Sequence, residues 1–157
     1  MRKRTPWPKV RGMENELLDW LQTQYSGRFW GLVGIEVVAA ERGEVTYHVA
    51  LRADHMNTNE VAHGGVISSL IDSAAGSATR TVRTVAEIAA RPHATSDLHV
   101  TYLAPGIGRE LRAVARVVKA GRTAIFTEVE VTDDRGRAVA RGLVTFVIGG
   151  KRQGATE

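Results

Sequence analysis

The stretch 62–81, AHGGVISSLIDSAAGSATRT, constrains this chain more than any other. It opens on His63, Gly64 and Gly65 and continues with apolar and small residues at helical spacing, with Asp72 two turns inside. The segments before and after it have the composition of strands. The sequence therefore predicts one long central helix, and its glycine start and internal carboxylate make it the first candidate for a reactive site.

The predicted helix has two different faces. One is an apolar stripe suited to packing on a sheet, formed by Ile67, Leu70, Ile71, Ala74, Ala75 and Ala78. The other carries Ser68, Asp72 and Gly76 at i, i+4 spacing, with further serines, including Ser77, beside them. Side chains this small allow a ligand or a second helix to approach closely, and they allow a carboxylate to be recessed without being surrounded by hydrocarbon.

The start of this helix is suited to binding an anion or a developing oxyanion. Free N–H groups at a helix N-terminus carry partial positive charge. Gly64 and Gly65 leave room for a carbonyl group to reach those donors, and His63 adds a titratable group beside them. With Asp72 as base or nucleophile, these are the parts needed for acyl transfer or hydrolysis.

Gly64 and Asp72 lie too far apart on one helix to act on a single carbonyl carbon. Eight residues of helix correspond to a rise of roughly 12 Å at ~1.5 Å per residue. If both residues serve one reaction, the second comes from a partner subunit whose helix runs in the opposite sense. The spacing therefore predicts an isologous dimer with two shared sites.

Around this helix the sequence predicts an α+β layout with one antiparallel sheet. We expect a short amphipathic helix over 14–25 and strands over 32–40 and 44–51. The central helical pattern fades near Ala90 and stops at Pro92. Four more strands are then expected over 94–103, 110–119, 123–132 and 138–148, separated by turn residues.

Length and composition indicate one domain, over 13–149, with a basic flexible arm at 1–12 and a flexible tail at 150–157. No apolar run approaches the ~20 residues that span a bilayer, and the N-terminus lacks the apolar core of a signal peptide. We therefore expect a cytoplasmic protein with no membrane contact.

The absence of cysteine excludes disulfides and thiolate zinc sites, and no metal site is predicted. The net charge of +4 suits an anionic partner, but no nucleic-acid-binding motif is present.

Each of these features also has a simpler interpretation. Gly64 and Gly65 fit an ordinary loop turn, and Asp72 fits a solvated acid on a helix face. His63 fits a capping or surface histidine, and Asn57 in the polar loop 52–62 fits a turn residue.

In the context NTNEVAHGGVISSLIDSA these residues resemble the signature of hotdog-fold thioesterases, and most of all the PaaI-like and 4-hydroxybenzoyl-CoA thioesterase branch. The resemblance extends over about residues 32–148. It implies a sheet wrapped around the long helix and a homodimer whose sheets join edge to edge. It also implies a homotetramer, as a dimer of dimers, in many members, with the active site at the dimer interface.

The resemblance implies an acyl-CoA thioesterase without metal or redox cofactor, CoA being part of the acyl-CoA substrate. The backbone N–H of Gly64, with Gly65, would polarise the thioester carbonyl. Asp72 would act from the neighbouring subunit as nucleophile or general base. Asn57 would orient the attacking water or the thioester, and His63 would assist near the carbonyl or the leaving thiol.

Six further residues are predicted to contact the substrate: Ser68, Gly76, Ser77, Lys119, Gly121 and Arg122. Many relatives carry Glu at the position of Asp72, and Ser or Thr at the position of Gly76. The turn formed by Lys119, Gly121 and Arg122 resembles the family's nucleotide-contacting turn, although an ordinary charged hairpin tip has the same composition.

Two other functions of the same fold stay open. One is a non-catalytic acyl-CoA-binding or sensor protein, which would bind the ligand without hydrolysing it. The other is a hydratase or dehydratase, which would show a His/Asp or His/Glu pair at a differently built helix entrance. A nucleic-acid binder is the least favoured alternative.

Overall fold

The computed structural model describes residues 14–25 and 27–150. The predicted basic arm and nearly all of the predicted tail lie outside these residues. The helices of the described part are α1 (Glu14–Tyr25), α2 (Phe29–Val33), the short 3-10 turn η1 (Ala53–His55), α3 (Gly64–Thr81) and α4 (Val85–Ala90). Its strands are β1 (Ile35–Glu41), β2 (Glu44–Ala50), β3 (His93–Tyr102), β4 (Glu110–Ala120), β5 (Ala124–Asp133) and β6 (Ala138–Ile148).

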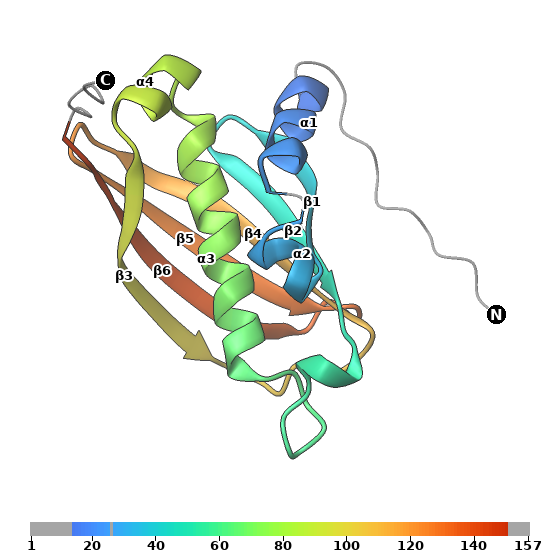
Figure 1. The fold of residues 1–157 in the computed structure, drawn as a ribbon. Helices are drawn as coiled ribbons and strands as arrows, with labels where there is room; N and C mark the ends of the chain where they lie inside the picture. The colour runs from blue at the N-terminus through green and yellow to red at the C-terminus, as the bar shows by residue number, and fades with distance from the viewer. Residues whose placement is uncertain (1–13, 26, 151–157) are drawn as a thin grey trace.

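The six strands form one antiparallel sheet in the order β1-β2-β4-β5-β6-β3. Figure 1 shows α3 lying against one face of this sheet, with α1 and α2 on the same side. The expected hotdog arrangement, an antiparallel sheet around one long helix, is confirmed.

The core lies between α3 and the sheet, and the predicted apolar stripe of α3 supplies its helical half. Leu70 and Ile71 of that stripe are fully buried. Val45, Tyr47 and Val49 on alternate positions of β2 are fully buried too, as the period of two predicted. Burial of a side chain as large as leucine contributes about 1.5–3 kcal/mol. The contrast between apolar and polar faces therefore fixes how α3 sits on the sheet.

Close approach of α3 to the sheet depends on Gly142 of β6. A Cβ atom at this position would lie 2.5 Å from Cγ2 of Ile71, a separation that real side chains do not reach. Only glycine allows the helix to pack this close to the strand here.

The predicted strand over 32–40 begins too early. Residues Phe29–Val33 form the short helix α2, which ends at Gly34 in the left-handed conformation, φ +75°. The Gly34 N–H donates to the Trp30 carbonyl oxygen at 2.7 Å and closes the helix. The segment is rich in aromatic and aliphatic residues, so its composition suits a strand as well, and the period of so short a helix is hard to detect.

The central helix is also interrupted earlier than expected. It ends at Thr81, and α4 begins a new helix after Thr84. The Thr84 side chain accepts from the Glu87 N–H at 3.2 Å, while the Glu87 carboxylate accepts from the Thr84 N–H at 2.7 Å. This reciprocal capping box favours a fresh helix start over continuation of the first helix.

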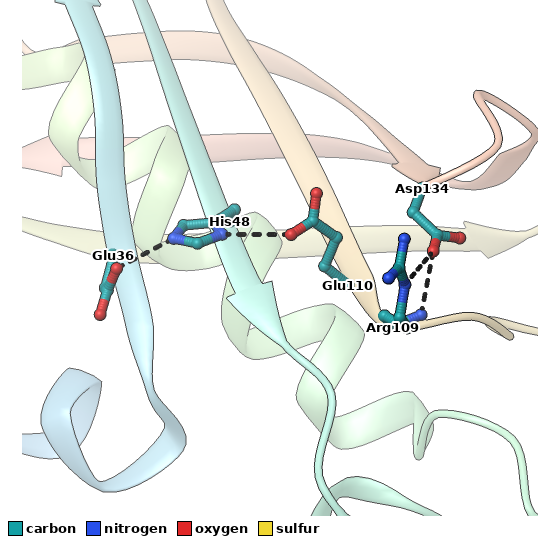
Figure 2. A network of polar contacts seen from close by, with 5 residues as sticks. All are labelled: Glu36, His48, Arg109, Glu110 and Asp134. Carbon is teal, nitrogen blue, oxygen red and sulfur yellow. Dashed lines mark hydrogen bonds and ion pairs between the residues drawn. The ribbon is translucent and has the colours of Figure 1, made fainter. Parts of the chain in front are cut away.

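The outer face of the sheet, opposite α3, is polar across β1, β2 and β4. Figure 2 shows His48 between two carboxylates, with its Nε2 3.0 Å from Glu36 Oε2 and its Nδ1 3.9 Å from Glu110 Oε2. Arg109, just before β4, contacts Asp134, just after β5, through its backbone N–H and its side chain. Glu36 and Arg109 are the exposed members of these contacts, while His48, Glu110 and Asp134 are partly buried. Pairs with an exposed member contribute little stability.

Candidate active site

The N-terminus of α3 is capped by His63. Its Nδ1 accepts a hydrogen bond of 2.9 Å from the Gly65 N–H, and its backbone N–H donates to the His55 carbonyl oxygen at 2.7 Å. Because Nδ1 is an acceptor, the neutral ring carries its proton on Nε2. The Gly65 N–H is thus engaged by His63, whereas in the described part of the chain the Gly64 N–H has no acceptor. The capping interpretation of His63 holds, and Gly64 supplies the N–H that can meet a ligand.

A side chain at either glycine would crowd a neighbouring side chain. The Tyr102 hydroxyl of β3 donates to the Gly64 carbonyl oxygen at 3.0 Å. A Cβ on Gly64 would lie 3.2 Å from that hydroxyl oxygen, and a Cβ on Gly65 would lie 2.9 Å from Nδ1 of His63. Tyr102 therefore fixes the first peptide of the helix, and it is a residue that sequence reasoning missed.

Asp72 lies half-buried two turns into α3. The Thr95 hydroxyl of β3 donates a hydrogen bond of 2.8 Å to Asp72 Oδ1. This bond fixes one carboxylate oxygen and so orients the other. Thr95 was also missed, because the sequence does not reveal which strand residue faces a given helix residue.

Asp72 forms part of the wall of a cavity of about 460 Å³ between α2, α3 and β3. The small-residue face predicted for the helix lines it, since Ser68, Gly76 and Ser77 share that wall. Ser77 is itself buried, with its hydroxyl 2.8 Å from that of Tyr47. Three of the substrate-binding residues predicted from sequence are therefore brought together with Asp72.

Several residues of this cavity were not predicted. Aromatic and aliphatic side chains come from α2, β3 and β6, namely Phe29, Trp30, Leu98 and Phe146. Arg80 and His93 add polar groups at the C-terminal end of α3. The cavity therefore has apolar surfaces for the body of a ligand and polar groups along the helix.

His93 is held as a neutral ring. Thr79 donates its hydroxyl proton to the Gly76 carbonyl oxygen at 2.7 Å, so its oxygen accepts from Nε2 of His93 at 3.2 Å. Nδ1 is then the acceptor that faces the Arg83 guanidinium at 3.4 Å. Burial, and after it the charges of Arg80 and Arg83, lowers the pKa of His93 from 6.5 to about 4. His93 is therefore uncharged at neutral pH.

Asn57 lies outside this cavity and organises its own loop. Its side-chain oxygen accepts from the Asn59 N–H at 2.8 Å and from the Val61 N–H at 3.4 Å. Its backbone N–H donates to the Val61 carbonyl oxygen at 2.9 Å. These bonds match the turn-residue interpretation and shape the loop that leads to His63.

Lys119, Gly121 and Arg122 lie at the turn between β4 and β5, apart from the cavity. The Gly121 N–H donates to the Ala124 carbonyl oxygen at 2.8 Å, and a Cβ on Gly121 would lie 2.8 Å from that same oxygen. The Arg122 carbonyl oxygen accepts from Arg91 at 3.4 Å. The glycine is thus explained by the turn, while both basic side chains are exposed.

One subunit does not bring Gly64 and Asp72 into one cavity. His63, Gly64, Gly65 and Asn57 are absent from the lining of the cavity that holds Asp72. The arrangement agrees with the separation expected from helix rise, and the dimer that would join the two sets stays a prediction.

Among the described residues no three His, Cys, Asp or Glu side chains gather as metal ligands would. No helix in the same part of the chain is long and apolar enough to cross a membrane.

The family model of the "Thioesterase superfamily" matches residues 59–140, more than half of the chain. Human "Acyl-coenzyme A thioesterase 13" is 28% identical over 117 residues, which cover 73% of this chain and 80% of the human protein. Among solved structures, conserved protein PA5202 from Pseudomonas aeruginosa is 29% identical with a TM-score of 0.74, covering 81% of this chain and 98% of that one. The E. coli PaaI protein from the phenylacetic acid degradation operon is 19% identical with a TM-score of 0.77, covering 89% and 98%. At 19% identity, the similarity to the PaaI protein shows a shared fold.

Proposed function

The chain belongs to the thioesterase superfamily and is a thioester hydrolase, and from this premise we propose that it hydrolyses acyl-CoA to a free acid and CoA, with Asp72 as the reactive carboxylate. The observation that carries the proposal is the placement of Asp72. It lies in the wall of a cavity large enough for an acyl group, with one oxygen held by Thr95. A positioned carboxylate of this kind acts as general base or as nucleophile.

The oxyanion that forms at the thioester carbonyl needs a donor. The Gly64 N–H at the start of α3 is the proposed donor, since the Gly65 N–H is engaged by His63. A backbone N–H at a helix N-terminus is fixed before the reaction and carries partial positive charge. A thiolate is a good leaving group, so little acid catalysis by His63 is needed.

Two routes follow from the same geometry. In the first, Asp72 takes a proton from water, and the hydroxide attacks the carbonyl carbon and displaces the CoA thiolate. In the second, Asp72 attacks the carbonyl carbon directly and displaces the CoA thiolate, forming a mixed anhydride that water then hydrolyses to the free acid and the Asp72 carboxylate. Both need only Asp72, water and backbone donors, so we propose no metal or redox cofactor.

The donor and the carboxylate are proposed to come from two subunits of a homodimer. Eight helical residues separate Gly64 from Asp72, roughly 12 Å at ~1.5 Å per residue. β3 is an edge strand whose residues are largely exposed, including Leu98 and Tyr102, and it supplies both Thr95 and Tyr102 to the site. Pairing of this edge with its copy would bring the two half-sites together, and pairs of such dimers would give the homotetramer. The proposed interface and the site thus share one strand.

The acyl-CoA substrate is proposed from the printed function of relatives such as human acyl-coenzyme A thioesterase 13. A net charge of +4 favours a ligand with several phosphate charges. The exposed side chains of Lys119 and Arg122 are proposed to contact these phosphates, and Asn57 is proposed to orient the loop beside the thioester.

The direct test is release of free thiol from a panel of acyl-CoAs by wild type and by Asp72→Asn, with circular dichroism to check folding. We expect the variant to keep its fold and lose at least ~100-fold in kcat. Full activity of Asp72→Asn would refute the role of Asp72. Binding of every acyl-CoA without any release of thiol by wild type would favour the sensor alternative.

A further inference from the structure

Gly76 lies in the interior of α3, one turn after Asp72, and lines the same cavity. It is partly exposed, whereas its neighbours Ala75 and Ser77 are buried. Glycine in a helix interior is less favourable than alanine, because it loses more backbone freedom on folding. A glycine at this position therefore lowers the stability of the helix, and the reason for it lies either in the packing of the fold or in the cavity.

The packing of the fold does not require glycine at position 76. Its backbone is helical, a conformation that residues with side chains adopt readily. A Cβ atom on Gly76 would lie 3.5 Å from Cε1 and Cζ of Phe146, which is ordinary van der Waals contact. At Gly142, by contrast, a Cβ atom would lie 2.5 Å from Ile71 Cγ2. Alanine would therefore fit at position 76 without a shift of its neighbours, which leaves the cavity as the reason for the glycine.

The space that Gly76 leaves free lies beside Asp72. Residues four apart on a helix are neighbours on one face, with Cβ atoms about 5–6 Å apart. Because helical side chains lean toward the N-terminus, a side chain at position 76 would lie over the turn that carries Asp72. Apart from the adjoining residues of α3, the described part of the chain brings only the Phe146 ring within 4 Å of the Cβ position. The outer atoms of a larger side chain would therefore enter the cavity.

The other side of Asp72 along the helix is occupied by side chains. Ser68, one turn before Asp72, lines the cavity, and its hydroxyl donates to the Gly65 carbonyl oxygen at 3.1 Å. The Ser69 hydroxyl donates to the same oxygen at 2.7 Å. The free space next to the carboxylate is therefore on the Gly76 side.

The cavity wall that faces position 76 is held in place. The Phe146 ring is buried and meets the His93 ring edge to face, with centroids 5.3 Å apart and an angle of 90° between the planes. His93 is itself held, with Nε2 3.2 Å from the Thr79 hydroxyl oxygen and Nδ1 3.4 Å from the Arg83 guanidinium. Since this wall is fixed on the sheet side, the residue at position 76 sets the width of the cavity at this point.

The carbonyl carbon of a bound thioester must approach Asp72, whether the carboxylate attacks it or activates a water molecule. The carbon next to that carbonyl, the α-carbon of the acyl group, then lies beside the carboxylate as well. We propose that Gly76 is a specificity-determining residue, which makes room beside Asp72 for acyl groups that are branched at the α-carbon. The inference rests on the proposed acyl-CoA thioesterase function and specifies its substrate class.

The test compares two pairs of isomeric substrates, butyryl-CoA with isobutyryl-CoA and valeryl-CoA with 2-methylbutyryl-CoA. The members of a pair contain the same atoms and differ only in the branch at the α-carbon. Wild type, Gly76→Ala, Gly76→Val and the control Gly31→Ala are assayed by free-thiol release. Gly31 lies in the helix α2, where a Cβ atom would meet no atom within 4 Å, and it is not among the residues that line the cavity. The control thus adds a methyl group to a helix without narrowing the cavity.

We expect wild type and Gly31→Ala to hydrolyse the two isomers of a pair with kcat/KM values within about 3-fold of each other. Gly76→Ala should lower kcat/KM for the branched isomer about 10-fold more than for the straight one, and Gly76→Val should widen this difference, because the added carbons take the space of the branch. A wild type that prefers the straight isomers by about 10-fold or more would overturn the inference and leave the thioesterase assignment in place. Equal losses on both isomers in the Gly76 variants would overturn it too.

The stability of Gly76→Ala tests the premise that the fold does not need this glycine. Because alanine favours the helix, its Tm should be equal to or higher than that of wild type, with an unchanged elution volume in size-exclusion chromatography. A lower Tm or a changed number of subunits would overturn the inference, because the glycine would then serve the packing of the chain or of a dimer.

A binding measurement tests the same selectivity independently of catalysis. Calorimetry with Asp72→Asn, which holds the substrates uncleaved, should give Kd values for butyryl-CoA and isobutyryl-CoA within about 3-fold of each other. In Asp72→Asn/Gly76→Val the Kd for isobutyryl-CoA should rise about 10-fold more than that for butyryl-CoA, and an unchanged ratio would contradict the inference. If wild type hydrolyses no acyl-CoA, the proposed function fails, and this measurement still decides whether Gly76 admits the branch.

Discussion

Thr95 and Asp72 are joined by a hydrogen bond of 2.8 Å from the Thr95 hydroxyl to Asp72 Oδ1. The bond links the edge strand β3 to the central helix at the carboxylate proposed to act on the thioester. It restricts the rotation of the carboxylate, and so the direction in which its second oxygen points. A catalytic group held in one orientation gains rate because less freedom is lost on reaching the transition state.

Thr95→Val removes this hydroxyl with little change in volume. The carboxylate then rotates more freely, and we expect kcat to fall about 10-fold, while the free energy of unfolding changes by about 1 kcal/mol or less. Acyl-CoA hydrolysis followed by free-thiol release measures the effect. Thr101→Val on the same strand is the matched control, since Thr101 belongs to the outer face of the sheet. Equal losses in both variants would point to the strand rather than to the Asp72 contact.

Gly64→Ala places a Cβ atom 3.2 Å from the Tyr102 hydroxyl oxygen. Tyr102 must then move by a few tenths of an ångström, which weakens its bond to the Gly64 carbonyl oxygen, and the added methyl group takes up space beside the proposed oxyanion donor. We expect a loss of about 10-fold or more in kcat with substrate binding largely kept. Gly31→Ala provides the comparison, because a Cβ at Gly31 meets no atom within 4 Å. An unchanged kcat in Gly64→Ala would argue against Gly64 as donor.

Gly142→Ala crowds the contact between β6 and α3, because the added Cβ would lie 2.5 Å from Ile71 Cγ2. Overpacking of this kind costs about 1–3 kcal/mol in the free energy of unfolding. The double variant Gly142→Ala/Ile71→Ala should be less destabilised than the sum of the single variants, since the second change removes the clashing atom. Urea denaturation measures all four proteins. Strict additivity would mean that the helix does not pack against the strand at this point.

His93 gives a pH dependence of stability with a defined sign. The folded pKa, about 4, lies below the usual value of 6.5. Between pH 6.5 and pH 4 His93 binds a proton in the unfolded chain but not in the folded chain. The free energy of unfolding therefore falls as the pH drops from about 6.5 to about 4, and the contribution of His93 to it is constant above that window. The loss at the acid end is about 3 kcal/mol. His93→Gln should show a flatter decrease in the free energy of unfolding between pH 7 and pH 4.5, and a slope identical to that of wild type would contradict the buried neutral histidine.

Much of the fold follows from residue patterns. The segment 62–81 contains the observed helix Gly64–Thr81, and the predicted strand 138–148 has the bounds of β6. In both segments the spacing of apolar residues is regular over the whole length. The helix α2 was missed because it is short and rich in residues that also suit strands. The break after Thr81 was visible in the sequence as a Thr-Val-Ala-Glu capping box, which the continuing apolar pattern obscured.

The family and its helix were predictable, whereas the partners of the site residues were not. Asp72 meets Thr95 only through the position of β3 beside β6, and that pairing contains a register shift between Thr95 and Asp97. Arg80 in the sequence is an ordinary basic residue near a helix C-terminus, where the helix dipole favours a cation. Its place in the cavity depends on how α1, α2 and β3 surround the helix.

The claim that Gly64 and Asp72 complete each other across two subunits has a direct test by mixing two impaired variants. A heterodimer of Asp72→Asn and Gly64→Ala has one intact site, with Gly64 from the first subunit and Asp72 from the second. Co-expressed or refolded in equal amounts, the mixture should recover about a quarter of wild-type activity, since random pairing gives half heterodimers with one of two sites intact. Activity that stays at the level of the separate variants, although mixed dimers form, would contradict the shared site.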